Sequence, residues 1–224
     1  LGGVKCDIGP EQTEPILAGL EFLEERTHHY LDVVSNDALF LRRTRGIGVM
    51  TRDEAERLGV VGPTARASGV PRDIRIDAPY LLYNEHPVEL IVEEAGDLEA
   101  RFKVRVRELF ESYRVIRALL ANLPEGDLTT RIPRRIKPAE TVSRIEAPRG
   151  ELFYFIKSNG TDTAERVKVR TPTLPNMASV VVTAVGHQLA DMPMILAGMR
   201  VSRNGERQAW TWEQLRQYGI EWYR

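Results

Sequence analysis

One long amphipathic segment, which begins at Asp97, is the strongest constraint on the fold of this chain. Large apolar residues recur there at gaps of three and four, the spacing that lines one face of an α-helix. These residues are Leu98, Phe102, Val106, Leu109, Tyr113, Ile116, Leu120 and Leu123. Asp97 is a suitable N-terminal cap, and Pro124 with Gly126 ends the pattern. A helix of this kind must bury its apolar face, so the sequence predicts a mainly helical protein.

Four basic residues lie on the other faces of this expected helix: Arg101, Lys103, Arg105 and Arg107. One interpretation is a solvated helix surface, partly paired with the acidic residues Glu99, Glu108 and Glu111. The other interpretation is a docking face for an acidic partner or cofactor. The first is favoured for most of the four residues.

The remaining helical signals are shorter or less regular. Residues 11–36 have helical periodicity, and a short helix is expected over 37–43. Thr51 and Glu54 have the spacing of a capping box, and Gly59 ends the short helix that follows them. The segment 60–94 is rich in Gly and Pro and predicts an ordered but irregular connection.

The C-terminal half predicts strands first and then helix. Residues 150–157 and 166–170 have strand character, and Ser158-Asn159-Gly160 is a turn signal between them, which predicts a β-hairpin. Residues 172–197 are helical in character, with an interruption expected at Pro193. The predicted fold class is therefore mainly α with a small β-hairpin.

Composition excludes several classes of protein. The 224 residues are 42% hydrophobic, which is enough for a core, and 31 basic residues against 32 acidic ones give no field for nucleic acid. One cysteine, Cys6, excludes a disulfide framework and a thiolate metal site closed by this chain alone. No apolar stretch approaches the ~20 residues that span a bilayer. The start at Leu1, without Met or a leader pattern, leads us to expect a processed product or one part of a split gene.

The residues by themselves show no self-contained active site. Nucleotide-binding, nucleophile-elbow and zinc-protease motifs are absent, and the four histidines do not form a cluster with metal-ligand spacing. His187 and Asp191 lie four residues apart on an expected helix, a pair that is more often structural than catalytic. The chain is therefore either a subunit that builds a site with others or a non-catalytic scaffold.

An ordered set of short segments resembles one family. They are RGIG at 45–48, GPTARASGV at 62–70, DIR at 73–75, GDLEAR at 96–101, EAPRGE at 146–151, RTPTLPN at 170–176 and GHQLAD at 186–191. In this order and spacing they resemble the large subunit of group 4 energy-converting NiFe hydrogenases and its relative, the 49 kDa quinone-site subunit of respiratory complex I. The resemblance covers residues 2 to about 198, and it implies the C-terminal part of such a subunit, with a helical core that is incomplete at its N-terminus.

The resemblance also implies a site and partners. Pocket-lining positions would be Ala147, Pro148, Arg149, Pro172 and Thr173, where a guanidinium and a hydroxyl can hydrogen-bond an anionic group in a dry cavity. Supporting positions would be Arg66, His187 and Asp191. The alternative for Arg149 is a buried ion pair with Glu146 or Glu151. A small iron–sulfur subunit, membrane-arm subunits and a quinone or other electron acceptor are the implied partners and cofactors.

Two departures from the family pattern shape the functional hypothesis. The family's N-terminal part has no counterpart here, so a separate chain or segment is expected to supply it. The cysteine pair expected soon after Asp191 is replaced by residues without thiols, so the four thiolates of a NiFe centre are missing and no metal is expected in this chain. Thr171-Pro172-Thr173 resembles the hydrogenase branch, whereas the missing thiolates resemble complex I.

The leading hypothesis is therefore a redox-complex subunit that is inactive alone. It would form one wall of the electron-acceptor pocket of a complex I-like or hydrogenase-like oxidoreductase, peripheral on the cytoplasmic membrane. The alternative is a catalytically inactive assembly scaffold of the same complex. We expect one hydrogenase large-subunit-like region over residues 1–199 and a polar tail over 200–224 that carries three tryptophans.

Overall fold

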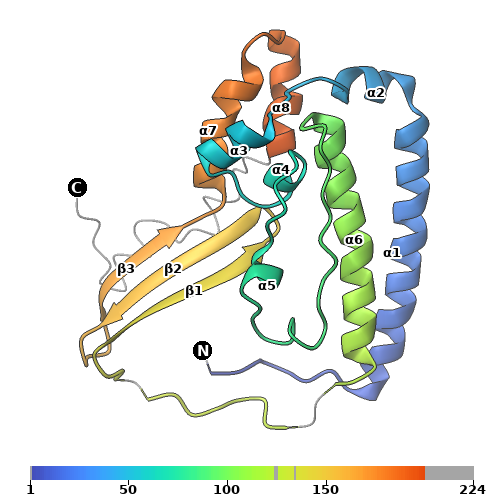
Figure 1. Cartoon of the computed structure of the whole chain (residues 1–224). Coiled ribbons are helices and arrows are strands. Elements are labelled where there is room, and N and C mark those ends of the chain that lie inside the picture. Colours follow the sequence, from blue (N-terminus) through green and yellow to red (C-terminus); the bar gives the residue numbers. More distant parts are fainter. Residues whose placement is uncertain (1, 124–125, 134, 200–224) are drawn as a thin grey trace.

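Two long antiparallel helices dominate the computed structural model, which describes residues 2–123, 126–133 and 135–199. These are α1 (Pro10–Asn36) and α6 (Leu98–Leu120), which lie side by side along their lengths (Figure 1). The Thr27 and Tyr113 hydroxyls are 3.0 Å apart, and the rings of His28 and Phe110 lie 4.3 Å apart between centroids. The predicted long helix and its cap are confirmed, since the Asp97 carboxylate accepts from the Ala100 N–H at 2.8 Å.

Four short helices connect the long ones. They are α2 (Ala38–Thr44), α3 (Arg52–Leu58), α4 (Pro63–Arg66) and α5 (Ile74–Asp77). The predicted capping box forms, because the Glu54 N–H donates to the Thr51 hydroxyl while the Glu54 carboxylate accepts from the Thr51 N–H. The irregular connection expected over 60–94 is also confirmed, apart from the single turns of α4 and α5.

The sheet has three strands where the sequence predicted two. β1 (Ala139–Ala147), β2 (Gly150–Ser158) and β3 (Ala164–Arg170) form an antiparallel sheet in the order β1-β2-β3. The predicted hairpin corresponds to β2 and β3, and the prediction missed β1. This strand is exposed along most of its length, so it lacks the apolar alternation that marks a half-buried strand.

The helical C-terminal region divides at a different point from the predicted one. α7 (Thr173–Ala184) ends before Gly186, whose φ of +85° suits glycine, and α8 (Met192–Met199) follows a short 3₁₀ turn at Leu189–Asp191. Pro193 does not break a helix as expected. It lies in the first turn of α8, where its missing N–H leaves no hydrogen bond unmade.

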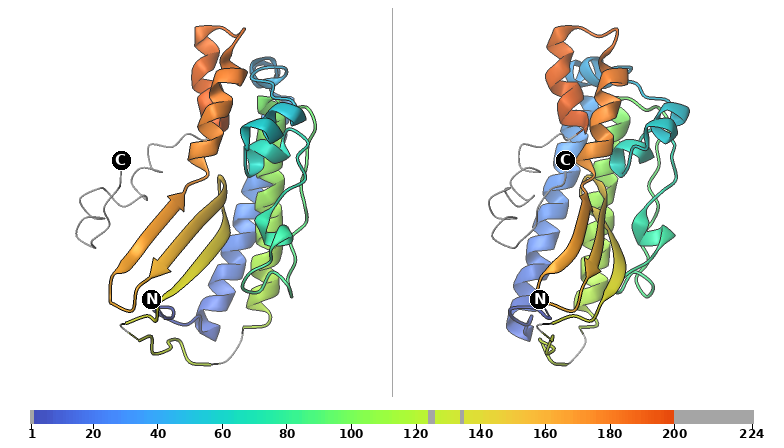
Figure 2. Two further views of the ribbon diagram at one scale, coloured as in Figure 1. Left: turned by 60° about the vertical axis from the view of Figure 1, so that its left-hand side comes forward. Right: turned by 90° about the vertical axis from the view of Figure 1, so that its left-hand side faces the viewer.

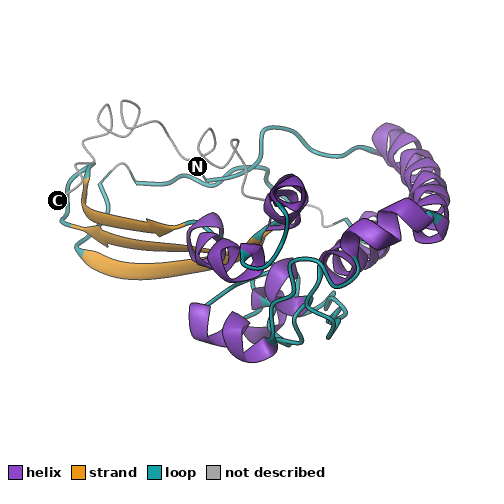
Figure 3. Cartoon of the chain, turned by 90° about the horizontal axis from the view of Figure 1, so that it is seen from above, coloured by secondary structure: helices purple, strands orange, loops and turns teal. Residues whose placement is uncertain are grey.

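The core lies where α3, α4 and the irregular connection pack against the N-terminal half of α6. One cluster contains Met50, Ala55, Val60, Ala65 and Val70, and a second contains Ala67, Ile91, Ala100 and Val104. Seen from the front and from above, the short helices lie between the sheet and the long helices (Figures 1 and 3), and in both views of Figure 2 α7 and α8 stand above the end of the sheet. The fold thus brings the short helices, the start of β2 and α6 close together.

Arg101 corrects one expectation about the surface of the long helix. Its side chain is fully buried, and its guanidinium donates to the carbonyl oxygens of Gly48 and Gly96 at 2.7 and 2.9 Å. Burial lowers the pKa of this guanidinium to about 10. The solvated interpretation holds for Lys103, which pairs with Glu99 at 3.0 Å and is half exposed.

Two sequence expectations concern residues outside the described ranges. The tail 200–224, with Trp210, Trp212 and Trp222, lies outside them, and so does the Pro124 stop signal. Within the described ranges, every helix is too short or too polar to cross a bilayer.

Candidate functional site

Several of the segments that carry the family resemblance meet at one point, the turn between β1 and β2. Gly62 precedes α4 and Gly150 begins β2, and a Cβ built on Gly62 would lie 2.3 Å from the Gly150 Cα. Both glycines have positive φ values, +71° and +125°, which residues with side chains rarely adopt. The backbones therefore approach this closely only because both positions are glycine.

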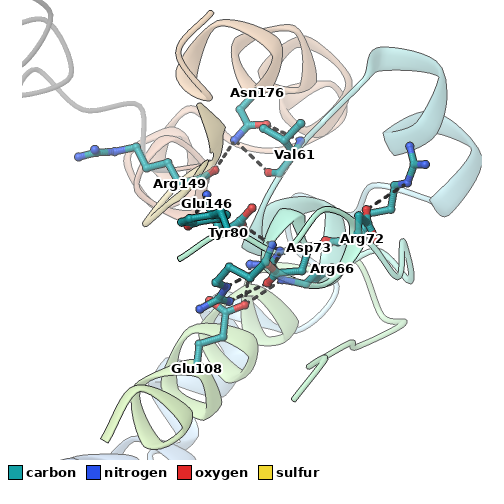
Figure 4. A network of polar contacts seen from close by, with 11 residues as sticks. Val61, Arg66, Arg72, Asp73, Tyr80, Glu108, Glu146, Arg149 and Asn176 are labelled. Atoms are coloured by element: carbon teal, nitrogen blue, oxygen red, sulfur yellow. Dashed lines mark hydrogen bonds and ion pairs between the residues drawn. The ribbon is translucent and has the colours of Figure 1, made fainter. Parts of the chain in front are cut away.

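Asn176 of α7 hydrogen-bonds the two backbone segments that meet at this turn. Its side-chain oxygen accepts from the Val61 N–H at 3.0 Å, and its amide donates to the carbonyl oxygens of Val61 and Arg149 at 3.3 and 3.2 Å (Figure 4). Asn176 is only 1% exposed, so these bonds satisfy polar groups that water cannot reach. One side chain thus joins α7, the loop before α4 and the β1–β2 turn.

Close to this turn, Arg66 is the centre of a buried charge cluster. Its guanidinium is 1% exposed and lies 3.2 Å from Asp73, 2.8 Å from Glu108 and 3.0 Å from Glu146. Arg75 binds the Asp73 carboxylate with two hydrogen bonds, at 2.9 and 2.6 Å. The cluster links α4, α5, α6 and β1, and three carboxylates in it face two guanidinium groups.

The pKa values of two of these carboxyl groups are shifted in opposite directions. Burial raises the pKa of Glu146 to about 7, and the charge of Arg66 only partly offsets that effect. Burial would also raise the pKa of Asp73, but the hydrogen bonds from Arg75 and the charge of Arg66 outweigh it, so that pKa is lowered. At neutral pH, the Asp73 carboxyl is therefore ionised, whereas the Glu146 carboxyl is partly protonated.

A pocket of about 330 Å³ opens beside the cluster, between α6 and the β1–β2 turn. Its lining residues are Arg66, Arg75, Arg105, Glu108, Leu109, Ser112, Glu146, Ala147 and Pro148. Five of these residues are ionisable and three are apolar, so the pocket offers a small organic molecule both charged groups and an apolar wall. A larger hollow of about 450 Å³ at the start of α1 is lined mostly by apolar residues, with Glu14 as its one ionisable group.

The structure divides the sequence-predicted site residues into two sets. Ala147, Pro148 and Arg66 line the 330 Å³ pocket. Arg149, Pro172 and Thr173 lie outside its lining, and the Arg149 guanidinium points away from Arg66 (Figure 4). The two carboxylates considered as ion-pair partners for Arg149 contact other guanidinium groups: Glu146 contacts Arg66, and Glu151 contacts Arg144 and Arg170.

His187 and Asp191 do not form the pair that their spacing suggested. His187 precedes the 3₁₀ turn, and its Nε2 accepts from the Gly48 N–H at 3.0 Å. Asp191 instead pairs with Arg43 of α2 at 3.3 Å. Both side chains hold the region around α7 and α8 to the rest of the chain, which is a structural role.

Glu108 and Glu146 are the site residues that sequence reasoning missed. Glu108 was assigned to a solvated helix surface, and Glu146 was considered only as a partner of Arg149. For Glu108 the sequence carries a signal, because this residue directly precedes Leu109 of the apolar pattern. A charged side chain at such a position needs a partner of opposite charge if the fold buries it.

The chain's own residues do not fit a NiFe centre, which needs four thiolates. The sequence has one cysteine, and Cys6 is exposed and lies outside the pocket lining. Across the described ranges, no three His, Cys, Asp or Glu side chains come together in a way that would hold a metal ion.

Comparison with known proteins assigns this chain to a family. The model of the 49 kDa subunit of respiratory-chain NADH dehydrogenase matches residues 1–139 and 129–202. An NADH-quinone oxidoreductase subunit of Dehalococcoides mccartyi is 34% identical over 202 residues, covering 89% of this chain and 55% of its own length. An F(420)H(2) dehydrogenase subunit of Methanosarcina mazei is 37% identical over 206 residues, and the carbon monoxide-induced hydrogenase of Rhodospirillum rubrum is 36% identical over 197; each match covers 88% of this chain and 55% of the relative.

A solved structure agrees with these matches. A chain of the membrane-bound sulfane sulfur reductase, an archaeal respiratory membrane complex, superposes with a TM-score of 0.84 at 32% identity. The match covers 90% of this chain and 57% of that one. The chain therefore spans just over half the length of the relatives it matches.

Proposed function

Because this chain belongs to the family of the 49 kDa subunit of respiratory-chain NADH dehydrogenase, we propose that it works as the C-terminal region of a large subunit in a membrane-associated oxidoreductase complex. In this proposal the helical core around α6 corresponds to the core of a hydrogenase-type or complex I-type large subunit. The chain is inactive alone and forms one wall of the electron-acceptor pocket.

The observation that carries the proposal is the convergence of three sequence segments beside one pocket. The stretch from Arg66 to Asp73, the segment around Glu108 and the segment around Glu146 are distant from one another in sequence, and the fold brings three carboxylates within 3.2 Å of one guanidinium. Ala147 and Pro148 line the pocket beside them. A site assembled from distant segments, with an ionisable group poised near neutral pH, is typical of a functional pocket.

The residues have distinct roles in the proposed site. Leu109, Ala147 and Pro148 give the acceptor an apolar wall, and Arg66 with Arg75 holds the carboxylates in place. A quinone takes up protons together with electrons, and Glu146 is a pocket group that holds an exchangeable proton at neutral pH. An iron–sulfur cluster in a neighbouring subunit would supply the electrons.

Arg149 and Thr173 are assigned to the face that meets this neighbour, and the buried Pro172 supports them from below. The Arg149 side chain reaches away from the Arg66 cluster (Figure 4). Thr173 is half buried at the start of α7. A small iron–sulfur subunit would bind there, and membrane-arm subunits would hold the assembly on the cytoplasmic membrane. The family's N-terminal part would come from a segment or chain beyond the matched region.

The test is to fill the pocket within the assembled complex. Leu109 lines the pocket from α6 and is 45% exposed, so Leu109→Trp adds bulk without disturbing the core. Ile116→Trp is the matched control, since Ile116 is 38% exposed on the same helix, two turns away, and outside the lining. We expect Leu109→Trp to raise the KM for the acceptor about tenfold while the complex still assembles. Equal kinetics for the two assembled variants would refute the proposal that the acceptor binds in this pocket.

A second candidate, an assembly scaffold without acceptor chemistry, has one observation in its favour. The Arg66 guanidinium is surrounded by three carboxylates and the Arg72 carbonyl, which is also the pattern of a structural core. The same experiment distinguishes the two, because a scaffold would tolerate Leu109→Trp with no change in KM.

A further inference from the structure

α7 (Thr173–Ala184) buries polar side chains and exposes apolar ones. Its buried face is polar, with Asn176, Ser179 and Thr183 at 1% exposure or less. Its outward face is apolar: Leu174, Met177 and Val181 lie at helical spacing, and Val185 follows directly after the last residue of the helix. These four residues are between 44% and 76% exposed. A helix on a solvated surface has the opposite pattern.

The polar face is fixed in place, so the helix cannot rotate to bury its apolar side. Asn176 bonds the backbones of Val61 and Arg149, as described above. The Ser179 hydroxyl donates to the Asn176 carbonyl at 2.6 Å, and the Thr183 hydroxyl donates to the Ser179 carbonyl at 2.9 Å. These bonds satisfy the buried hydroxyls within the helix, which lets the polar face pack against α8.

The chemistry of the outward face selects the kind of partner. α7 contains no charged residue between Thr173 and Ala184. Amphipathic helices that lie on membranes carry basic residues beside their apolar face, and this helix has none. An uncharged apolar stripe of this length is typical of an obligate protein interface, the kind that resembles a protein core cut in half.

We propose that this apolar face of α7 is the docking surface for the part of the large-subunit fold that lies outside the matched region, whichever polypeptide carries that part. The solved relative and the curated relatives are matched over 55% to 57% of their length, so more than two fifths of each chain remains outside the match. That part belongs to the same subunit in those relatives. It therefore meets this region at high effective concentration, as an obligate interface requires. The inference depends on family membership and not on the acceptor pocket.

Photo-cross-linking in the cells that make the protein tests the proposal directly. p-Benzoylphenylalanine is placed at Val181, which is 69% exposed in the middle of the face, or at Val142 on β1, which is 53% exposed, as the matched control. After irradiation, the chain is isolated under denaturing conditions and the cross-linked peptides are identified by mass spectrometry. The proposal predicts that position 181 links to peptides of the large subunit from outside the matched region, at about ten times the yield of position 142.

Three results would overturn the proposal: links from position 181 to another copy of residues 2–199, links to lipid or to a protein that carries no part of the large-subunit fold, or no links at all. A second pair of variants protects the test against a change in folding. The probe is moved to Val185 and combined with Val181→Lys or with Val142→Lys. We expect the first combination to lose about nine tenths of the cross-link and the second to keep it, because a buried lysine disrupts only the face that is covered. Equal yields from the two combinations would also refute the proposal.

Discussion

Replacing Glu146 by Gln should remove one identifiable part of the pH dependence of stability. The Glu146 carboxyl titrates near pH 7 in the folded chain, because burial raises its pKa from the ordinary value of 4.5. The unfolded chain releases this proton at a lower pH than the folded chain does. The folded state is therefore favoured at low pH, and this contribution is lost as the pH rises from about 4.5 to about 7.

The size of the effect follows from the two pKa values. The difference between 4.5 and about 7 corresponds to about 3 kcal/mol of unfolding free energy. Asp73 contributes with the opposite sign, because its pKa is lowered, but that stability is lost only below about pH 4. A window from pH 4.5 to pH 8 thus isolates Glu146 from Asp73.

The assay is urea denaturation of the wild type and Glu146→Gln at several values of pH within this window. We expect the wild type to lose about 3 kcal/mol relative to the variant from the lower to the upper end. Glu140→Gln removes an exposed carboxylate at the start of the same strand and controls for a general change of charge. A wild-type-minus-variant difference that is constant, or that grows with pH, would refute the reasoning, because it would mean that the Arg66 ion pair outweighs burial.

Three further predictions concern the same region. Asn176→Ala leaves three buried backbone groups without partners and should cost about 3 kcal/mol in urea denaturation, whereas a cost below about 1 kcal/mol would mean that water replaces the amide. Gly62→Ala forces a Cβ to 2.3 Å from the Gly150 Cα and should lower the thermal midpoint far more than Gly59→Ala, which has a similar φ but open space; equal shifts would show that the contact is relieved cheaply. Arg66→Met leaves three carboxylates without their central cation and should cost about 4 kcal/mol at pH 8, with a smaller cost at pH 5 where Glu146 is neutral; a loss that does not vary with pH would argue against the raised pKa of Glu146.

The features that depend on neighbouring residues were predictable from the sequence. The Asp97 cap, the Thr51–Glu54 capping box and the β2–β3 hairpin are decided within a few residues, and each is confirmed. β1 was missed because its exposed residues carry no apolar alternation. The break between α7 and α8 was misplaced because Pro193 fits a first helical turn as well as a helix end.

The site was predictable only in part, for a physical reason. The family resemblance implies pocket-lining roles for Ala147, Pro148, Arg149, Pro172 and Thr173 and a supporting role for Arg66; of these residues, Ala147, Pro148 and Arg66 line the 330 Å³ pocket. The partners of Arg66 come from three other elements, and only the tertiary fold determines which carboxylates meet one guanidinium. Arg101 shows the same limit, since its buried bonds to Gly48 and Gly96 follow from packing and not from helix periodicity.

The most direct test of the central claim is to isolate the chain from native membranes in mild detergent, identify its partners by mass spectrometry, and measure iron and nickel in the eluate. A redox-complex subunit should co-purify with membrane proteins and an iron–sulfur subunit, with iron present and nickel absent, since this chain has one exposed cysteine and no thiolate set. Stoichiometric nickel would contradict the argument from the missing thiolates. A chain that elutes without partners or iron would contradict the assignment to a redox complex.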